Sequence, residues 1–173
     1  MLDKNRLLNS DLALHGIFIC VAALMGYLES LIPFAFPVPG IRLGLANIVI
    51  IWVLYTLGLR SALIVSLLRC LIIGLLFGNI YSIMFSIAGA FSSLIVMFLL
   101  KKYAPGKFSV MGVSVCGAIV HNIAQVIVAM IVIKNAYIIT YLPVLIGVGV
   151  ISGIVIGLLG GLLYKKIKLV PAN

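Results

Sequence analysis

Long apolar segments constrain this chain more than any other feature of its sequence. Residues 135–164 contain no charged side chain, and similar apolar runs recur along the whole length. A helix needs about 20 predominantly apolar residues to cross a bilayer. Only 9% of the residues are charged and 65% are hydrophobic, whereas a soluble domain carries about a quarter charged residues. The sequence therefore predicts an integral membrane protein.

Six transmembrane helices account for these runs. We expect residues 1–173 to form a single all-α membrane domain, a compact bundle with no room for a second domain. The N-terminal segment has no apolar core followed by a small-residue cleavage site, so the first span is expected to be a retained helix. The expected spans are approximately 12–32, 42–57, 60–77, 80–100, 109–133 and 140–164.

The net charge of +9 comes from cations between the apolar spans. Such cations set the orientation of the protein and contact anionic lipid headgroups, so we expect no nucleic-acid partner. With a cytoplasmic N-terminus the outer segments hold only Arg42 and Lys134. The positive-inside rule then predicts a protein of the plasma membrane with both termini in the cytoplasm. The inner segments hold Lys4, Arg6, Arg60, Lys101, Lys102, Lys107, Lys165, Lys166 and Lys168.

Arg69 lies in the middle of the third expected span. A guanidinium at that depth costs at least about 2.5–3.5 kcal/mol, so it normally faces the interior of a bundle and holds a partner or a ligand. Two interpretations stay open: Arg69 binds a substrate, or it is satisfied by amides and carbonyls of neighbouring helices and stabilises the bundle.

Other polar residues are expected at similar depth. Arg42 and Asn47 belong to the outer end of the second span, and the run HNIAQ in the fifth span offers imidazole and amide groups. Gln125 lies three and four residues after Asn122 and His121, so it shares a helix face with both. We expect a site for a small anionic or strongly polar substrate entering from outside. Its candidate residues are Arg42, Asn47, Arg69, His121, Asn122 and Gln125. The alternative is a Glu29–Arg42 pair at the mouth, with the other groups as interhelical hydrogen bonds.

The first outer connection, LIPFAFPVPG, cannot continue a helix because of its prolines. We expect a stiff, extended loop that lies over the mouth of the site; a short interfacial connector with aromatic anchors is the alternative. The candidate gating residues are Pro33, Phe34, Phe36, Pro37 and Pro39.

Small residues at four-residue spacing predict close helix packing. The sixth span has Gly149, Gly153, Gly157 and Gly161, and the fourth has Ser82, Ser86 and Ala90. Most of these faces are expected to pack internally. In the first span the candidates for docking a membrane partner are Gly16, Cys20, Ala22 and Gly26.

The sequence contains no sign of enzyme chemistry. The chain has only three acidic residues, Asp3, Asp11 and Glu29, and catalysis through bound Mg²⁺ needs clustered carboxylates. It has no Walker lysine motif, so it does not hydrolyse ATP by itself. Cys20, Cys70 and Cys116 lie in different spans and read as packing residues. We expect no catalytic residue, no metal site and no cofactor.

Several of these features together resemble the Gx transporter family. They are the six-span layout, the Pro-rich outer loop, the R-x-G-x-x-N run at Arg42, Gly44 and Asn47, the arginine in LLRCLIIGLLFG and the HNxxQ run. That family is often labelled heptaprenyl diphosphate synthase component I and is similar to the substrate-binding S components of energy-coupling-factor (ECF) vitamin transporters.

The resemblance implies a membrane subunit that captures a nutrient at the outer face. It also implies partners, namely a transmembrane coupling subunit and two cytoplasmic ATPases that drive release inside. S components commonly dock through an Ala-xxx-Ala face on the first helix, and the best matches here are Ala22-xxx-Gly26 and Gly16-xxx-Cys20. The alternative is a non-catalytic membrane partner of a soluble polyprenyl diphosphate synthase.

Overall fold

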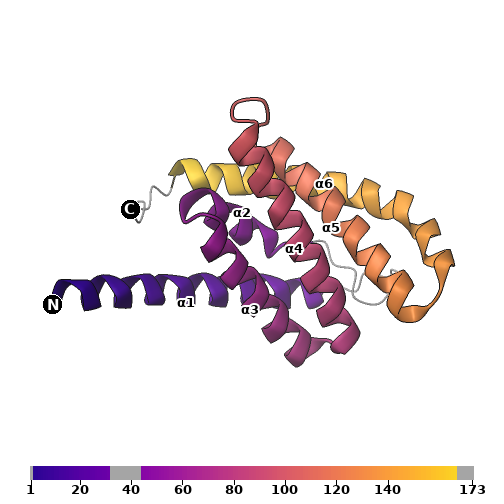
Figure 1. Ribbon diagram of the computed structural model, residues 1–173, viewed down its shortest axis with the longest axis horizontal. Helices are drawn as coiled ribbons and strands as arrows, with labels where there is room; N and C mark the ends of the chain where they lie inside the picture. The colour runs from indigo at the N-terminus through magenta and orange to yellow at the C-terminus, as the bar shows by residue number, and fades with distance from the viewer. Residues whose placement is uncertain (1, 32–43, 167–173) are drawn as a thin grey trace.

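The computed structural model describes residues 2–31 and 44–166, with side chains from residue 12 onward. The described residues contain helices and no strand, which confirms the expected all-α bundle (Figure 1). The helices are α1 (Leu2–Ser30), α2 (Asn47–Thr56), α3 (Leu59–Phe77), α4 (Ile80–Tyr103), α5 (Val110–Ile133) and α6 (Leu142–Lys166), and a 3₁₀ segment, η1 (Ala136–Tyr141), precedes α6.

Five of these helices are long and apolar enough to cross a bilayer: α1, α3, α4, α5 and η1–α6. Large apolar side chains on their outer faces are exposed, among them Leu75, Ile131 and Ile151. An apolar exterior of this extent is stable only against hydrocarbon. The protein is therefore a multi-pass membrane protein.

The second expected span is shorter than the sequence predicts. We expected a helix over 42–57, but α2 contains ten residues and is about 15 Å long, half the thickness of a hydrocarbon core. The cause lies in Gly44, whose φ of +84° places it in the left-handed region. A left-handed residue does not continue an α-helix, so α2 begins only after it, at Asn47.

Because α2 is short, its first turn lies part of the way along α3. A short turn joins the C-terminal end of α2 to the N-terminal end of α3. The two helices therefore run side by side from that end of the bundle, in opposite directions along the chain. Counting about 1.5 Å per residue from that turn, Asn47 on α2 and Arg69 on α3 reach nearly the same depth, about 13–15 Å in. The first turn of α2 thus lies near the middle of the membrane.

The glycines of α6 allow it to pack tightly on α5, as the sequence predicts. A Cβ on Gly153 would lie 2.8 Å from the Cα of Val115, and one on Gly157 would lie 2.5 Å from the Cα of Met111. Real Cβ atoms do not approach backbone that closely, so these positions need glycine. The α5–α6 contact is the most extensive in the bundle, followed by α4–α5.

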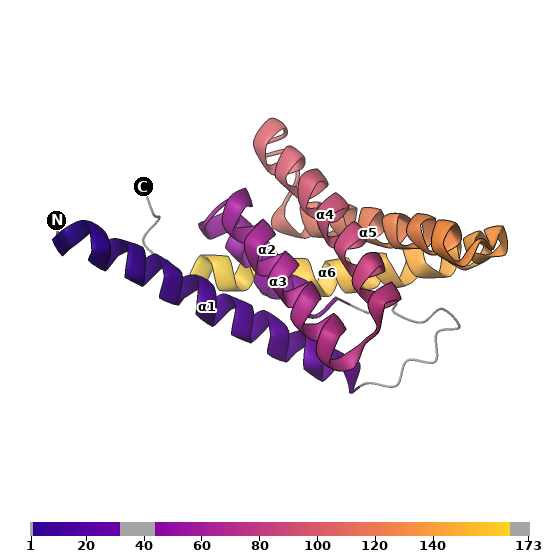
Figure 2. The ribbon, with the colours of Figure 1, turned by 60° about the horizontal axis from the view of Figure 1, so that its bottom comes forward.

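Helix α1 packs against α2 and α3 at the larger of two apolar clusters in the described residues. Helix α1 lies along α3, with Phe18 packed edge-on against Trp52 of α2 at 4.8 Å between ring centroids (Figure 2). Val53 and Leu54 of α2 and Val65 of α3 are fully buried in this cluster. Helix α1 begins and α6 ends on the same side of the molecule (Figures 1 and 2).

Candidate functional site: a buried polar cavity at mid-membrane

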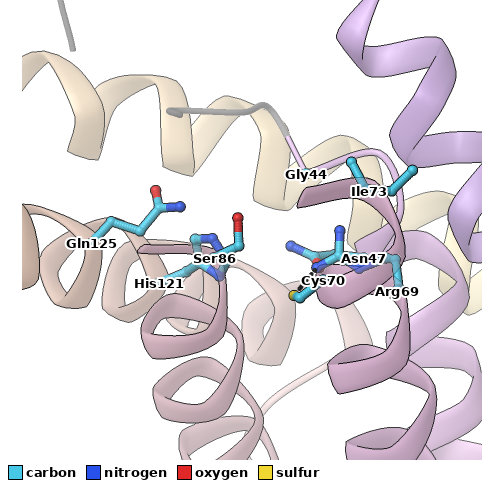
Figure 3. Close-up of a pocket in the computed structure, with 8 residues that line it drawn as sticks. All are labelled: Gly44, Asn47, Arg69, Cys70, Ile73, Ser86, His121 and Gln125. Carbon is cyan, nitrogen blue, oxygen red and sulfur yellow. Dashed lines mark hydrogen bonds between the residues drawn. The ribbon is translucent and has the colours of Figure 1, made fainter. Parts of the chain in front are cut away.

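A small cavity lies among α2, α3, α4 and α5, directly at the first turn of α2. Its volume is about 20 Å³, which is room for about one water molecule. Figure 3 shows Asn47, Arg69 and Cys70 on one side and His121, Gln125 and Ser86 on the other. The lining residues are Gly44, Asn47, Arg69, Cys70, Ile73, Ser86, His121 and Gln125.

Arg69 contributes the only cation of this lining. It comes from the middle of α3, is 7% exposed, and extends its guanidinium toward the side of His121 and Ser86 (Figure 3). A terminal nitrogen donates to the Cys70 Sγ at 3.5 Å, a weak acceptor. The Nε has no hydrogen-bond partner among the described residues. Among the described residues, the hydrogen-bond acceptor found for this buried guanidinium is thus a weak one, and its Nε–H stays without a partner.

Helix α5 supplies two neutral polar groups opposite Arg69. His121 and Gln125 are one turn apart and both are buried. The His121 imidazole fits against α4 only because residue 89 is glycine, since a Cβ there would lie 2.8 Å from the Nε2. Within the described part of the chain, the His121 Nδ1 and the Gln125 Oε1 have no hydrogen-bond partner. These atoms and the Arg69 Nε belong to side chains that line one cavity.

The turn before α2 forms the rest of the wall. The Gly44 N–H donates to a carboxylate oxygen of Glu29, which is buried at the end of α1. The Gly44 carbonyl accepts from the Asn47 N–H at 2.8 Å and so begins the helix. A Cβ on Gly44 would lie 2.7 Å from Nδ2 of the Asn47 side chain. The glycine thus positions the Asn47 side chain at the cavity.

Four of the six predicted substrate-binding residues meet at this cavity: Asn47, Arg69, His121 and Gln125. Asn122 does not. Its amide donates to the Leu145 carbonyl at 2.6 Å and faces α6 rather than the cavity. Arg42 lies outside the described residues, as do the proposed gating residues Pro33, Phe34, Phe36, Pro37 and Pro39.

Sequence reasoning did not assign Gly44, Cys70, Ile73 or Ser86 to the site. Gly44 lies in the R-x-G-x-x-N run, and Ser86 was expected to form part of a packing face. Cys70 and Ile73 carry no signal in the sequence, because an apolar residue on a transmembrane helix gives no indication of which neighbour it meets. Their place follows from the packing of α3.

The candidate docking residues of α1 divide into two sets. Ala22 is fully buried, and Gly26 faces Ile73 so closely that a Cβ would lie 3.1 Å from its side chain. These two residues pack inside the bundle and offer no external face. Gly16 and Cys20 are exposed, so only this pair stays available for a partner.

The cavity is suited to holding an anionic or polar group. Arginine is permanently charged and presents several N–H donors in a planar fork, while the imidazole and the two amides both donate and accept. None of the lining residues, all of which are described, is acidic. No group of three or more His, Cys, Asp or Glu in residues 2–31 and 44–166 could hold a metal ion.

One family model matches the chain. The model described as heptaprenyl diphosphate synthase component I matches residues 18–163, which includes every residue of the cavity lining. No curated protein and no solved structure matches the chain.

Proposed function

The chain belongs to the heptaprenyl diphosphate synthase component I family, and from this premise and the geometry of the cavity we propose that it is a substrate-binding membrane subunit. In this proposal it is the S component of an ECF-type uptake transporter in the plasma membrane. It captures a small anionic or amphipathic nutrient from the outer face, and both of its termini are cytoplasmic.

The observation that carries this proposal is the set of buried polar atoms around Arg69 that have no hydrogen-bond partner in residues 2–31 and 44–166. If the polar groups served only to join helices, each would be paired, because an unsatisfied buried polar group costs about 1–3 kcal/mol. Asn122 follows that pattern through its bond to Leu145. Atoms of Arg69, His121 and Gln125 have no such partner in the described part of the chain, which favours a site whose partner is a ligand. Buried atoms of Trp52 and Ser66 also lack partners among the described residues, but neither side chain lines the cavity.

The position of α2 supports the same proposal. A half-length helix that begins at mid-membrane directs the positive end of its dipole at that depth. Interrupted transmembrane helices in transporters present such N-termini to anionic substrates. Arg69 and the first turn of α2 both favour an anionic group at the cavity, while the buried Glu29 carboxylate accepts from the Gly44 N–H of its wall. A carboxylate, phosphate or diphosphate group is the ligand chemistry that fits.

The proposal includes a transmembrane coupling subunit and two cytoplasmic ATPases as partners. The cations at one end of the bundle form a surface where these could bind. Arg60 lies in the first turn of α3, Lys101 and Lys102 in the last turn of α4, and Lys165 and Lys166 in the last turn of α6. The rings of Tyr55 and Tyr164 are in contact, with centroids 5.6 Å apart, so the C-terminal ends of α2 and α6 lie together on this side. By the positive-inside rule this end faces the cytoplasm.

The family description favours a second candidate function. A component I of heptaprenyl diphosphate synthase is a membrane partner of a prenyl synthase. In that case the basic end of the bundle would bind the soluble enzyme subunit. Purification in mild detergent distinguishes the two: the transport proposal predicts a coupling subunit and ATPases in the complex, and recovery of a prenyl synthase alone would replace it with this second function.

The direct test of the site is the substitution Arg69→Gln. Native mass spectrometry of the purified protein identifies molecules that the wild type retains. Losing a buried charged contact with an anion costs roughly 2–5 kcal/mol, so Arg69→Gln should weaken retention by at least about 30-fold. Lys134→Gln, which removes an exposed cation at the end of α5, is the matched control and should retain the ligand. Equal retention by wild type and Arg69→Gln would refute the site.

A further inference from the structure

The polar cavity is too small for the ligand it would recognise. Its volume of about 20 Å³ holds about one water molecule, whereas ligand sites usually measure about 300–1,000 Å³. A second hollow lies next to it, between α1 and α3, with a volume of about 530 Å³. It is lined by apolar side chains, among them Cys20, Ala23 and Leu24 of α1 and Ile72, Ile73 and Leu76 of α3. We refer to it as the α1–α3 groove.

Ile73 belongs to both spaces. It lines the polar cavity on one side and the α1–α3 groove on the other. The residue facing it on α1 is Gly26, where a Cβ would lie 3.1 Å from the Ile73 Cγ1. This isoleucine therefore borders both a polar space that has donors but little room and a larger space lined almost entirely by apolar groups. A ligand that occupies both spaces would have to displace this side chain.

Two aromatic rings lie in contact at one end of the α1–α3 groove. Tyr27 and Phe77, near the outer ends of α1 and α3, have ring centroids 4.8 Å apart, and both line the groove. An apolar chain that starts at Ile73 would therefore run along the face between the two helices. With a volume of about 530 Å³ and a lining that is almost entirely apolar, the groove suits an apolar chain better than a polar one.

We propose that the two spaces form one site for a single-chain amphiphile, with its anionic head at Arg69 and its apolar tail in the α1–α3 groove beyond Ile73. This inference rests on the proposed function of the cavity and narrows its substrate class. Neither space accounts for such a ligand alone: the groove gives no reason to select it from bulk lipid, and the cavity has no room for it. Because Ile73 borders both spaces, a ligand could place its head among the polar groups of the cavity and its tail in the larger volume of the groove.

The test uses decyl phosphate with a photoreactive diazirine at the end of its chain. The full-length protein is placed in phosphatidylcholine nanodiscs, illuminated, and its labelled residues are mapped by mass spectrometry. Label should concentrate on groove residues such as Cys20, Ala23 and Leu76, and excess unlabelled decyl phosphate should remove it. A decyltrimethylammonium probe with the same diazirine controls for partition into the bilayer and should leave the groove no more labelled than Ile151, an exposed residue of α6.

Three variants make the outcome decisive. Ala23→Phe fills the groove and should abolish groove labelling, as should Arg69→Gln, which removes the head contact. Val21→Phe places the same phenylalanine side chain at an exposed position of α1 outside the groove and should keep the label.

Three results would overturn this inference in different ways. Saturable labelling that Arg69→Gln abolishes but Ala23→Phe leaves unchanged would refute the groove and leave the proposed function of the cavity intact. Groove labelling that Arg69→Gln does not reduce would mean that the groove meets only bilayer lipid or a partner helix. If no labelling were saturable, the anion site itself would fail.

Discussion

The backbone N–H of Gly44 donates a hydrogen bond to the carboxylate of Glu29, and this contact joins the end of α1 to the turn that begins α2. Gly44 has a φ of +84°, which costs a residue with a side chain about 1–2 kcal/mol. The same residue lines the cavity beside Asn47. The conformation of one glycine thus sets both the depth of α2 and the position of a site residue.

We expect Gly44→Ala to damage the site as well as the fold. The new Cβ would lie 2.7 Å from Nδ2 of the Asn47 side chain, so this side chain must shift away from its position at the cavity. Unfolding should become easier by about 1–2 kcal/mol from the backbone strain alone, and retention of the ligand should fall. Thermal unfolding in detergent and native mass spectrometry measure the two effects.

Gly58→Ala is the matched control. Gly58 has nearly the same φ, +87°, but a Cβ there meets nothing within 4 Å, and it lies in the turn between α2 and α3, away from the cavity. It should lose similar stability and keep the ligand. If both variants lost the ligand equally, general destabilisation rather than the position of Asn47 would explain the Gly44 result.

Asn122 and Gln125 should respond to substitution in opposite ways. Asn122→Ala removes a bond to the Leu145 carbonyl, and interhelical bonds of this kind in membranes are worth about 0.6–2 kcal/mol. It should therefore lower stability without changing affinity. Gln125→Ala removes a side chain that lines the cavity and has an unpartnered oxygen among the described residues, so it should lower affinity. Ligand binding lost in Asn122→Ala but retained in Gln125→Ala would reverse these assignments.

Lys101 is predicted to stabilise α2 from outside the helix. Its ammonium group donates to the carbonyls of Leu54 and Tyr55 at 2.9 and 3.4 Å, where a cation also opposes the negative end of the helix dipole. Lys101→Met should therefore cost up to about 2 kcal/mol in unfolding measurements.

Lys102 provides the comparison for that substitution. It is exposed and lies over the rings of Phe98 and Tyr103 at 5.7 and 5.2 Å, contacts worth about 0.5–1 kcal/mol at such sites. Lys102→Met should thus cost less than Lys101→Met. Equal costs would show that the contact with the end of α2 contributes little.

The sequence alone determined the class of protein and most of the helices. A lack of charge over long runs leaves burial in a bilayer as the stable arrangement, and this argument needs no knowledge of tertiary contacts. The glycine spacing of α6 likewise predicted its close packing, because residues four apart lie on one helix face whatever the neighbour. The demand that Arg69 face the interior follows from the cost of a charge in hydrocarbon.

Only the tertiary structure decided which polar residues share a cavity. Asn122 and Gln125 are three residues apart on α5, and the sequence placed them on one face; in the structure Asn122 meets α6 and Gln125 meets the cavity. Side chains three apart point in directions that differ by about 60°, so the crossing of neighbouring helices selects their partners. The late start of α2 after Gly44, whose N–H bonds to Glu29 of α1, and the place of Ile73 between two spaces likewise depend on contacts between segments that are distant in the sequence.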